Sequence, residues 1–302
     1  MFMLISVIIP TRNRCQSLAT LLDSIEGIKL AAGVSAEFIV VNNASTDCTA
    51  NMLRDREHKS PQITLKIIEQ AVPGKSRALN RALTESCGQV LAILDDDVIV
   101  DEHCLAKHVE AYQQTDFAAV QGRVLPGNDP KGRSADPDRL QEYNIPLIDY
   151  GDEYREIRGL IGTNMSFKRE VLDTVGLFDP RLGPGASGFS EDTEFSARIR
   201  KAGFKIGYTP HAIVYHELNP ARYGRAYNRN VEYRKGLSRS IYRNDSIAFR
   251  VVPDFAINCI RYSHYSFLGH TQKAYKTEGR ILKCWGQIVG TFQSRRKRKL
   301  TT

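Results

Sequence analysis

The chain has 302 residues, which is long enough to bury a substantial core in one large domain or two smaller ones. Hydrophobic residues make up 42% and charged residues 25%, without a low-complexity run or an internal repeat. This composition excludes a mainly disordered protein and a repeat protein. The net charge of the whole chain is +8.

The charge is divided unevenly along the chain. Residues 1–219 contain 24 Lys and Arg against 30 Asp and Glu, a net charge of −6. Residues 220–302 contain 18 against 4, a net charge of +14, and the last basic cluster covers 295–299. A tail of this kind predicts an anionic partner, either a membrane surface or a nucleic acid.

Several features bear on where the protein works. The apolar start at residues 2–9 lacks a basic leader, so we do not expect a signal peptide. No window supplies the ~20 apolar residues of a membrane-spanning helix. The six cysteines show neither a CxxC pair nor metal-ligand spacing, which favours a reducing setting. We expect a cytoplasmic protein, soluble or peripheral on the inner face of the membrane.

The first 125 residues alternate short apolar runs with helical patterns, which is typical of strand–helix repeats that build a parallel sheet. The fourth apolar run has no polar residue, so we expect that strand at the centre of the sheet. Helical spacing of apolar residues predicts helices over 18–25, 49–56 and 78–83. The predicted strands are residues 4–9, 38–41, 64–68, 90–94 and 118–124.

The rest of the chain is less regular. Residues 126–158 are rich in Pro, Gly and charge and predict a long functional or mobile loop. A glycine-rich stretch at 183–188 leads into a helix that Ser190 should cap and Gly203 should end. Further predicted elements are an ordered segment at 160–168, a helix at 169–175, strands at 204–208 and 212–215, and basic helices over 219–243 and 281–292.

Three adjacent carboxylates, Asp95, Asp96 and Asp97, follow the fourth predicted strand. Ligands of open parallel sheets bind at the carboxyl ends of the strands. Adjacent carboxylates repel one another unless a cation is near, and oxygen ligands suit Mg²⁺ or Mn²⁺. An acidic turn is the alternative, but three acids in a row after a buried strand favour a divalent metal cofactor.

Four motifs, in order along the chain, resemble those of family 2 glycosyltransferases. They are residues 7–14 (VIIPTRNR), 40–47 (VVNNASTD), 94–97 (LDDD) and 190–195 (SEDTEF). The resemblance covers about residues 4–217 and implies an α/β fold of the GT-A type, with a Rossmann-like, mainly parallel central sheet and flanking helices. We therefore expect a GT-A domain over residues 1–218 and a basic helical extension over 219–302.

The resemblance also implies roles for the acidic cluster. Asp95 would lie near the ribose and sugar of a nucleotide-diphosphate donor, and Asp97 would bind the Mn²⁺ or Mg²⁺ ion that bridges the diphosphate. Asp96 would serve either role, and Asp95 is a second candidate metal ligand. His216 stands where similar enzymes often carry a metal-binding histidine, although a lone histidine is often structural, so both interpretations stay open.

The donor nucleotide is expected at the ends of the first two strands. By the resemblance Pro10, Thr11, Arg12 and Asn13 hold it, although a plain proline turn would explain this segment equally well. Relatives usually carry, at the position of Asn42, an Asp that contacts the uracil imide. An Asn can accept the same hydrogen bond but can also donate, so a UDP-sugar is the expected donor with a weaker preference for uracil.

A second set of residues is expected around the donor's diphosphate. Residues 73–80 resemble the segment that closes over the donor in the family. Lys75 and Arg77 at a helix start would favour phosphate on physical grounds as well, and a solvated basic face is the alternative.

The predicted catalytic base lies in the fourth motif. Inversion needs a carboxylate that removes the proton of the attacking hydroxyl, and Asp192, with Glu191 beside it, is our candidate. Both acids would also complement a helix dipole, worth ~0.3–1 kcal/mol each, but the resemblance favours catalysis. Gly162, Thr163 and Asn164 lie in the segment that faces the donor sugar and the acceptor in relatives.

These inferences converge on a metal-dependent inverting hexosyltransferase of cell-envelope polysaccharide synthesis. It would transfer a sugar to a hydroxyl of a glycan or lipid-linked acceptor, with its basic tail on an anionic membrane. A catalytically inactive nucleotide-sugar sensor or scaffold is the alternative, and the intact acidic residues count against it. Nucleic acid is not an expected partner, because no recognised motif accompanies the basic tail.

Overall fold

The structure is a computed structural model that describes residues 3–57, 64–127, 147–218, 222 and 224–300, without the side chains of 57 and 295–300. The chain forms two compact units, and each is described by itself. The first is Met1–Pro180 with Asp192–Asn219, and the second is Arg181–Glu191 with Pro220–Thr302. The second unit thus includes residues 181–191, which the sequence analysis assigned to the first domain.

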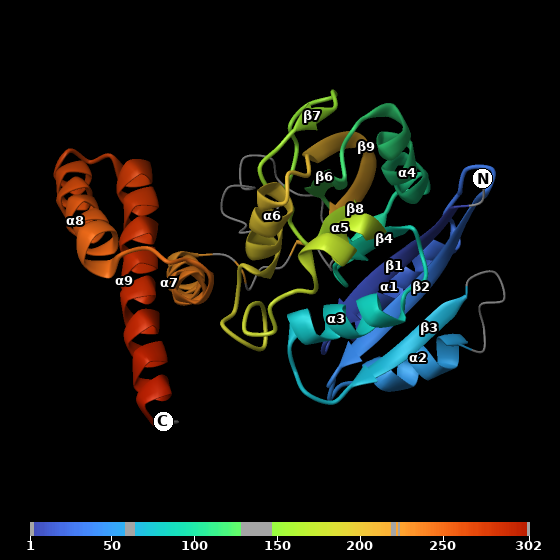
Figure 1. Cartoon of the computed structure of the whole chain (residues 1–302), viewed down its shortest axis with the longest axis horizontal. Coiled ribbons are helices and arrows are strands. Elements are labelled where there is room, and N and C mark those ends of the chain that lie inside the picture. Colours follow the sequence, from blue (N-terminus) through green and yellow to red (C-terminus); the bar gives the residue numbers. More distant parts are fainter. Residues whose placement is uncertain (1–2, 58–63, 128–146, 219–221, 223, 301–302) are drawn as a thin grey trace. The chain divides into compact units, whose positions relative to one another are not determined.

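The first unit is a central sheet flanked by helices (Figure 1). Its strands are β1 (Met3–Thr11), β2 (Val34–Asn43), β3 (Leu65–Gln70), β4 (Val90–Leu94), β5 (Val98–Val100), β6 (Ala119–Pro126), β7 (Arg155–Glu156), β8 (Asn164–Lys168) and β9 (Ile206–His216). Its helices are α1 (Cys15–Glu26), α2 (Thr49–Glu57), α3 (Lys75–Glu85), α4 (Cys104–Gln114), α5 (Arg169–Val175) and α6 (Glu191–Lys201), whose first residue is counted with the second unit.

The strands follow the order β3-β2-β1-β4-β8-β6-β9-β5, with β7 paired to β9. β4 is central and all five of its residues are buried, as the wholly apolar run predicted. Among the described strands four pairs are parallel and four antiparallel, because β8 runs against both β4 and β6, and β9 runs against both β5 and β7. The sheet is therefore mixed, and only its first half matches the expected parallel pattern.

The two strands predicted over 204–208 and 212–215 are one strand, β9. Its pairing with β6 shifts register, since Gly122 pairs with Thr209 and the next residue, Arg123, pairs with Ile213. Pro210 lies in the interruption, and proline cannot donate to a ladder, so it is tolerated at such an irregularity. The gap between the two predicted strands is therefore an irregularity within one strand.

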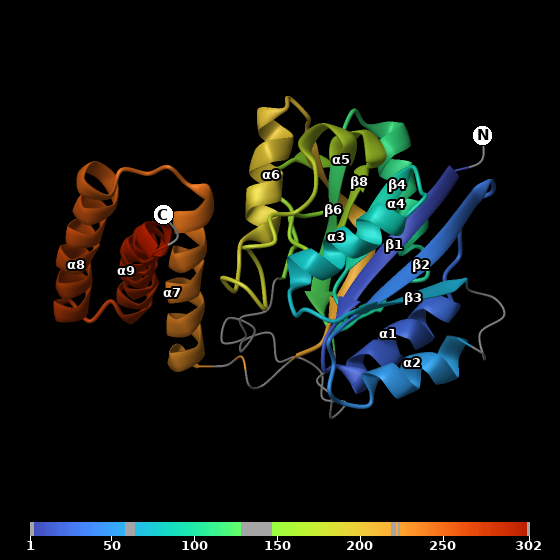
Figure 2. The same cartoon turned by 60° about the horizontal axis from the view of Figure 1, so that its bottom comes forward.

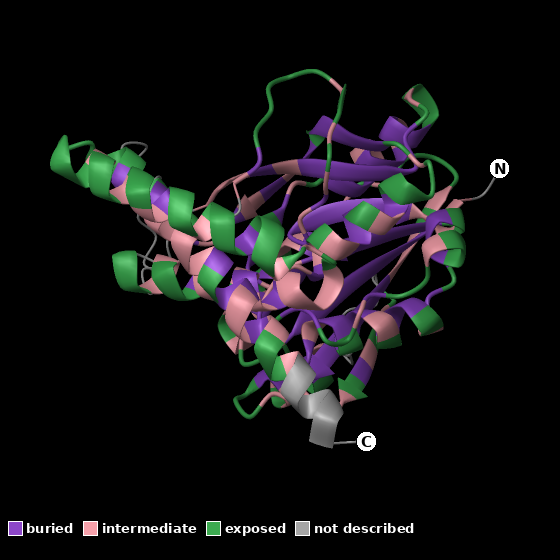
Figure 3. Ribbon diagram, turned by 60° about the vertical axis from the view of Figure 1, so that its left-hand side comes forward, coloured by how far each residue is buried: buried purple, intermediate pink, exposed green. Residues whose placement is uncertain are grey.

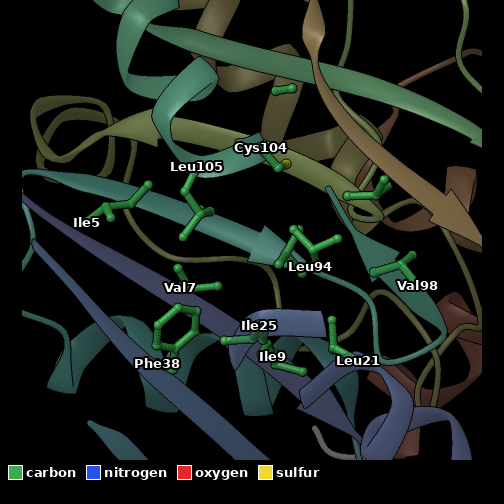
Figure 4. Close-up of a cluster of buried hydrophobic side chains, with 14 of the residues drawn as sticks. Ile5, Val7, Ile9, Leu21, Ile25, Phe38, Leu94, Val98, Cys104 and Leu105 are labelled. Carbon is green, nitrogen blue, oxygen red and sulfur yellow. The ribbon is translucent and has the colours of Figure 1, made fainter. Parts of the chain in front are cut away.

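Helices cover both faces of the sheet (Figure 1 and Figure 2). Alternate residues of β1 point to opposite faces, so Ile5, Val7 and Ile9 pack with α1, α2 and α4, whereas Ile8 packs with α3, α5 and α6. Figure 4 shows Ile9 beside Leu21 and Ile25 of α1. The strands other than β3 and β7 are buried along most of their length, as Figure 3 shows for the sheet. The sheet thus presents its strand ends, rather than its faces, to a ligand.

The second unit contains helices α7 (Arg225–Tyr242), α8 (Val252–Phe267) and α9 (Thr271–Leu300), with a π-helical turn η3 (Ile247–Val251) before α8. α9 packs against both α7 and α8. A Cβ atom on Gly236 of α7 would lie 2.1 Å from the carbonyl oxygen of Lys283, so only glycine permits this close crossing. The predicted start of the first basic helix, Asn219-Pro220, lies outside the described residues. The predicted helix over 281–292 falls within α9.

Candidate active site

The acidic cluster lies at the carboxyl end of β4, and Asp96 is tied to the end of β1. Thr11, the last residue of β1, donates a hydrogen bond to Asp96 Oδ2 at 2.7 Å. Burial, followed by the negative charge of Asp97, raises the pKa of Asp96 to about 7. Burial contributes most to this rise, and repulsion from the neighbouring acids adds to it.

Asp95 is held by two residues from other elements. Lys75, the first residue of α3, forms an ion pair with Asp95 Oδ1, and Thr163 donates to Oδ2 at 2.9 Å. Burial alone would raise the pKa of Asp95, but Lys75 and, less strongly, His216 lower it below its usual value. Both oxygens are engaged, so the metal-ligand role of Asp95 stays a prediction.

Asp97 faces His216, the last residue of β9. Asp97 Oδ1 lies 3.3 Å from His216 Nε2, and the two side chains are only 5% and 1% exposed. The other carboxylate oxygen lies 3.5 Å from the guanidinium of Arg14. His216 Nδ1 lies 2.8 Å from the main-chain oxygen of Glu217, which can only accept, so in the neutral ring Nδ1 carries the hydrogen. In this neutral form, Nε2 presents a lone pair beside a carboxylate oxygen. A nitrogen and an oxygen atom placed in this way are suitable ligands for a cation.

The side chains at this site suit a metal ion that takes some of its ligands from a bound substrate. They suit less well a metal ion held by protein ligands alone. Within the described ranges no group of three His, Cys, Asp or Glu side chains could hold a metal ion. Mg²⁺ and Mn²⁺ commonly use one or two carboxylates and take their other ligands from phosphates and water. Asp97 and His216 supply an oxygen and a nitrogen donor for such a site.

The loops after β1 and β2 are tied together beside the acidic cluster. Asn13 has φ 54°, its main-chain N–H donates to Ser45 Oγ at 3.1 Å, and its Oδ1 accepts from Thr46 N at 2.7 Å. Four residues of this stretch were predicted to contact the nucleotide. Pro10 is buried in β1, and Thr11 donates a hydrogen bond to Asp96. Asn13 forms hydrogen bonds that connect the two loops. Arg12 is exposed.

Cys15 and Cys48 form a disulfide that joins the same two loops. This corrects the expectation that the cysteines are reduced, for these two residues. Each cysteine lies a few positions beyond the end of one of two adjacent parallel strands, so the fold brings them together although 33 residues separate them.

Asn42 has a partner that sequence reasoning missed. Its Nδ2 donates to both carboxylate oxygens of Glu69, at 3.1 and 2.9 Å, and its Oδ1 accepts from Ser45 N at 3.3 Å. Asn42 and Glu69 are direct neighbours in the register of β2 and β3. Both residues stand at strand ends, at the edge of the sheet where the nucleotide is expected. That shared position is the feature of the sequence from which Glu69 could have been predicted as a partner of Asn42.

Lys75 lies close to Gly162 as well as to Asp95. A Cβ atom on Gly162 would lie 3.3 Å from Lys75 Nζ, so the backbone at Gly162 approaches the lysine closely. Burial raises the pKa of Asp192, and the charge of Lys75 and a hydrogen bond from the main chain of Gly162 partly oppose the rise. Lys75 therefore acts on two carboxylates, Asp95 and Asp192. Arg77, one residue past Ser76 on α3, is exposed.

The predicted acidic pair begins α6. Asp192 Oδ1 accepts from Thr193 N at 2.6 Å, and Glu191 is 7% exposed and is counted with the second unit. Ser190, expected to cap this helix, instead has φ 76°, which differs from the extended backbone of an ordinary N-cap. Non-glycine residues with such φ values concentrate at functional sites.

Asn164 does not reach the open edge of the sheet, contrary to its expected place beside the sugar. Its side chain is fully buried, donates to the main-chain oxygens of Arg123 and Ala212, and accepts from His108 Nε2 at 2.9 Å. Its amide and carbonyl are thus both engaged inside the core. Asn164 anchors the segment that carries Gly162 and Thr163, and this segment is what meets Lys75 and Asp95.

Residues 6–176 match the family described as Glycosyl transferase family 2. The chain belongs to this family. The four motifs that suggested it contribute Thr11, Asn42, the three acids after β4 and Asp192, and all of these except Asp192 lie inside the matched range.

Known relatives of this family 2 chain are distant. It is 26% identical to Probable glycosyltransferase YdaM of Bacillus subtilis over 60% of this chain and 43% of the relative. It is 24% identical to Glycosyltransferase AglE of Haloferax volcanii over 82% of this chain and 77% of the relative. The chain spans about half the length of the first relatives it matches.

The fold is also that of a solved glycosyltransferase. A mannosyltransferase from Pyrobaculum calidifontis, in complex with GDP-Man and Mn²⁺, superposes with a TM-score of 0.63 at 18% identity, over 97% of this chain and 88% of that one. This likeness shows that the sheet and its flanking helices have the GT-A fold predicted from the motifs.

Proposed function

We propose that the chain is a metal-dependent, inverting glycosyltransferase that takes a hexose from a nucleotide-diphosphate donor. The observation that carries the proposal is the pairing of Asp97 with His216 beside the Asp95–Lys75 ion pair, at the carboxyl ends of the strands. One set of groups suits a cation on a diphosphate, and the other suits the polar face of a ribose or sugar.

The donor is held by groups of complementary charge. Asp97 and His216 would hold a divalent ion, which when bound supplies positive charge against the departing diphosphate. Arg14 and Lys75 add positive charge next to the acids, and Thr163 fixes the orientation of Asp95. A UDP-sugar remains the expected donor, and the structurally similar mannosyltransferase in complex with GDP-Man is a reason to include guanine donors in any test.

Asp192 is the proposed base. It would accept the proton of the acceptor hydroxyl as that oxygen forms a bond to the anomeric carbon, while the bond from this carbon to the diphosphate oxygen breaks and its electron pair leaves with the diphosphate. The raised pKa of Asp192 makes it a stronger base than an ordinary carboxylate. The proposed acceptor is a glycan or a lipid-linked glycan of the cell envelope.

A donor panel tests the proposal. We expect a nucleotide-sugar of one base to raise the Tm of the full chain more with Mn²⁺ than without it. The same donor should slowly release nucleoside diphosphate in water without an acceptor. A sensor would bind the donor but release nothing, and a protein that no donor stabilises would refute both functions.

A further inference from the structure

Helix α8 of the second unit presents apolar side chains to solvent as well as to its own core. Its inner side carries the buried Asn258 and the half-buried Phe255, which packs on Trp285 of α9. The opposite side carries Ile260, which is 71% exposed, and Phe267, which is 90% exposed. A helix at the surface of a water-soluble domain ordinarily turns polar residues outward, whereas on α8 these large apolar side chains share the exposed surface with Arg261, Ser263 and His264.

The exposed apolar residues form a line. On α8 the outer stripe, as we call it, consists of Pro253, Ala256, Ile260 and Phe267, which are all exposed and recur at helical spacing along roughly 20 Å of helix. Phe249 of the preceding turn, 89% exposed, extends the apolar surface at one end. Ser263 and His264 interrupt this row between Ile260 and Phe267. Single exposed apolar residues are normal, whereas several large ones gathered on one side of a helix mark an interaction surface.

The net charge of the helical region that carries the stripe indicates what covers it. Residues 220–302 carry a net charge of +14, and only four of them are acidic. Three of those four acids are already neutralised by ion pairs inside the unit. Glu232 pairs with Lys235 and Lys283, Asp245 with Arg250, and Glu278 with Arg225. The remaining basic residues are therefore in excess, and they favour an anionic partner.

We propose that the outer stripe of α8 docks on an anionic lipid surface, with the helix lying in the plane of the headgroups. Apolar side chains would enter the headgroup boundary, and the excess positive charge would attract anionic lipid, which are the two components of interfacial binding by helices. A second copy of the chain fits less well, because pairing through the stripe would bring two strongly basic units together.

The contact would be peripheral. Throughout the part of the chain that the structure describes, no helix combines the length and the apolar character needed to cross a bilayer. The stripe also lies outside the basic cluster at 295–299, so lipid binding through α8 and binding through the tail can be separated by experiment.

The test is flotation of the full chain with phosphatidylcholine vesicles that contain or lack phosphatidylglycerol. Ile260→Gln/Phe267→Gln removes apolar area without changing the net charge, and both positions are so exposed that the Tm should stay within about 2 °C of wild type. We expect at least about a tenfold loss of binding to the anionic vesicles. Ser266→Gln, an exposed change off the stripe, is the matched control and should bind as wild type does.

Two results of the flotation test would overturn the proposal. One is wild-type protein that does not float with anionic vesicles, and the other is a stripe variant that floats as well as wild type. A chain ending at residue 294 should bind more weakly yet keep its dependence on Ile260 and Phe267. Loss of all binding on truncation, with an unaffected stripe variant, would assign binding to the tail. A lipid-independent dimer that the stripe variant abolishes would assign the surface to a second copy.

Discussion

Asn42 donates its side-chain amide to both carboxylate oxygens of Glu69, at 3.1 and 2.9 Å, across the ends of two adjacent parallel strands. The amide that could have donated to a base is thereby engaged. What remains for a ligand is the Glu69 carboxylate, because Asn42 is 2% exposed and its carbonyl oxygen already accepts from Ser45 N. Glu69 thus presents acceptors, as the Asp expected at the position of Asn42 would. Glu69 itself is exposed and able to receive a further donor.

The first prediction concerns this pair. Glu69→Ala should weaken binding of the preferred nucleoside diphosphate by about tenfold, because a hydrogen bond to a charged acceptor contributes roughly 1.5–3 kcal/mol. Calorimetric titration measures the change. Glu102→Gln, which alters another exposed carboxylate, is the control and should leave the affinity unchanged. Equal affinity of Glu69→Ala and wild type would remove Glu69 from base recognition.

The second prediction concerns the metal. His216→Ala and Asp97→Asn should each weaken Mn²⁺ binding in the presence of nucleoside diphosphate by at least about tenfold, since even outer contacts to metal ligands are worth that much. Titration of Mn²⁺ into the protein with saturating nucleotide gives the affinity. His103→Ala removes an exposed histidine and should have no effect. Unchanged affinity in both site variants would show that the ion binds elsewhere, and chelation with EDTA should lower nucleotide release by wild type.

The third prediction links Lys75 to Asp192. A base works only when ionised, so turnover is lost as the pH falls through the pKa of Asp192. Burial raises this pKa and Lys75 lowers it, so Lys75→Gln should move the acidic limb of the pH–rate profile to higher pH at saturating donor. Lys75→Arg keeps the charge and should largely restore the limb. Lys66→Gln, which changes a surface ion pair with Glu85, is the control. An acidic limb that does not move in Lys75→Gln would contradict the assignment.

The fourth prediction concerns the buried histidine behind the site. Burial lowers the pKa of His108 to about 4, although its hydrogen bond to Asn164 acts in the opposite direction. The unfolded chain takes up this proton near pH 6.5, whereas the folded chain resists it until about pH 4. The free energy of unfolding should therefore fall as the pH is lowered across this window, by up to about 3 kcal/mol.

Urea unfolding at pH 7.5 and 4.5 measures that loss. His108→Gln should be less stable than wild type at pH 7.5 because it disturbs the bonds to Asn164 and Ser166, yet it should lose less stability on acidification. The exposed His103→Gln should retain the wild-type slope. A His108→Gln variant with the same pH dependence as wild type would mean that His108 does not titrate in this window.

Local periodicity predicted the parts of the fold that depend on it. The apolar spacing of Leu18, Leu21 and Ile25 marks the buried face of α1, and the apolar run at Val90–Leu94 marks the central strand. Asp95, Asp96 and Asp97 could be placed at a strand end for the same reason. The antiparallel insertion of β8 between β4 and β6 could not be predicted, since it depends on pairing between residues that are far apart in the chain.

The hydrogen-bond and disulfide partners of the site residues could not be predicted from local sequence patterns either. Asn164 was placed near the sugar by motif, but its burial depends on His108, which lies 56 positions earlier. The bonds from Asn42 to Glu69 and from Cys15 to Cys48 follow from the register of adjacent parallel strands. Once strand neighbours are known, residues just beyond their carboxyl ends can be paired by inspection.

Release of nucleoside diphosphate from the donor that raises the Tm most, compared between wild type and Asp192→Asn in the presence of Mn²⁺, tests the central claim most directly. Asparagine is nearly the same size as aspartate but cannot take up the proton, so we predict that turnover falls at least about a hundredfold while donor binding persists. Turnover that survives in Asp192→Asn, or wild-type protein that releases nucleotide from no donor, would contradict the account.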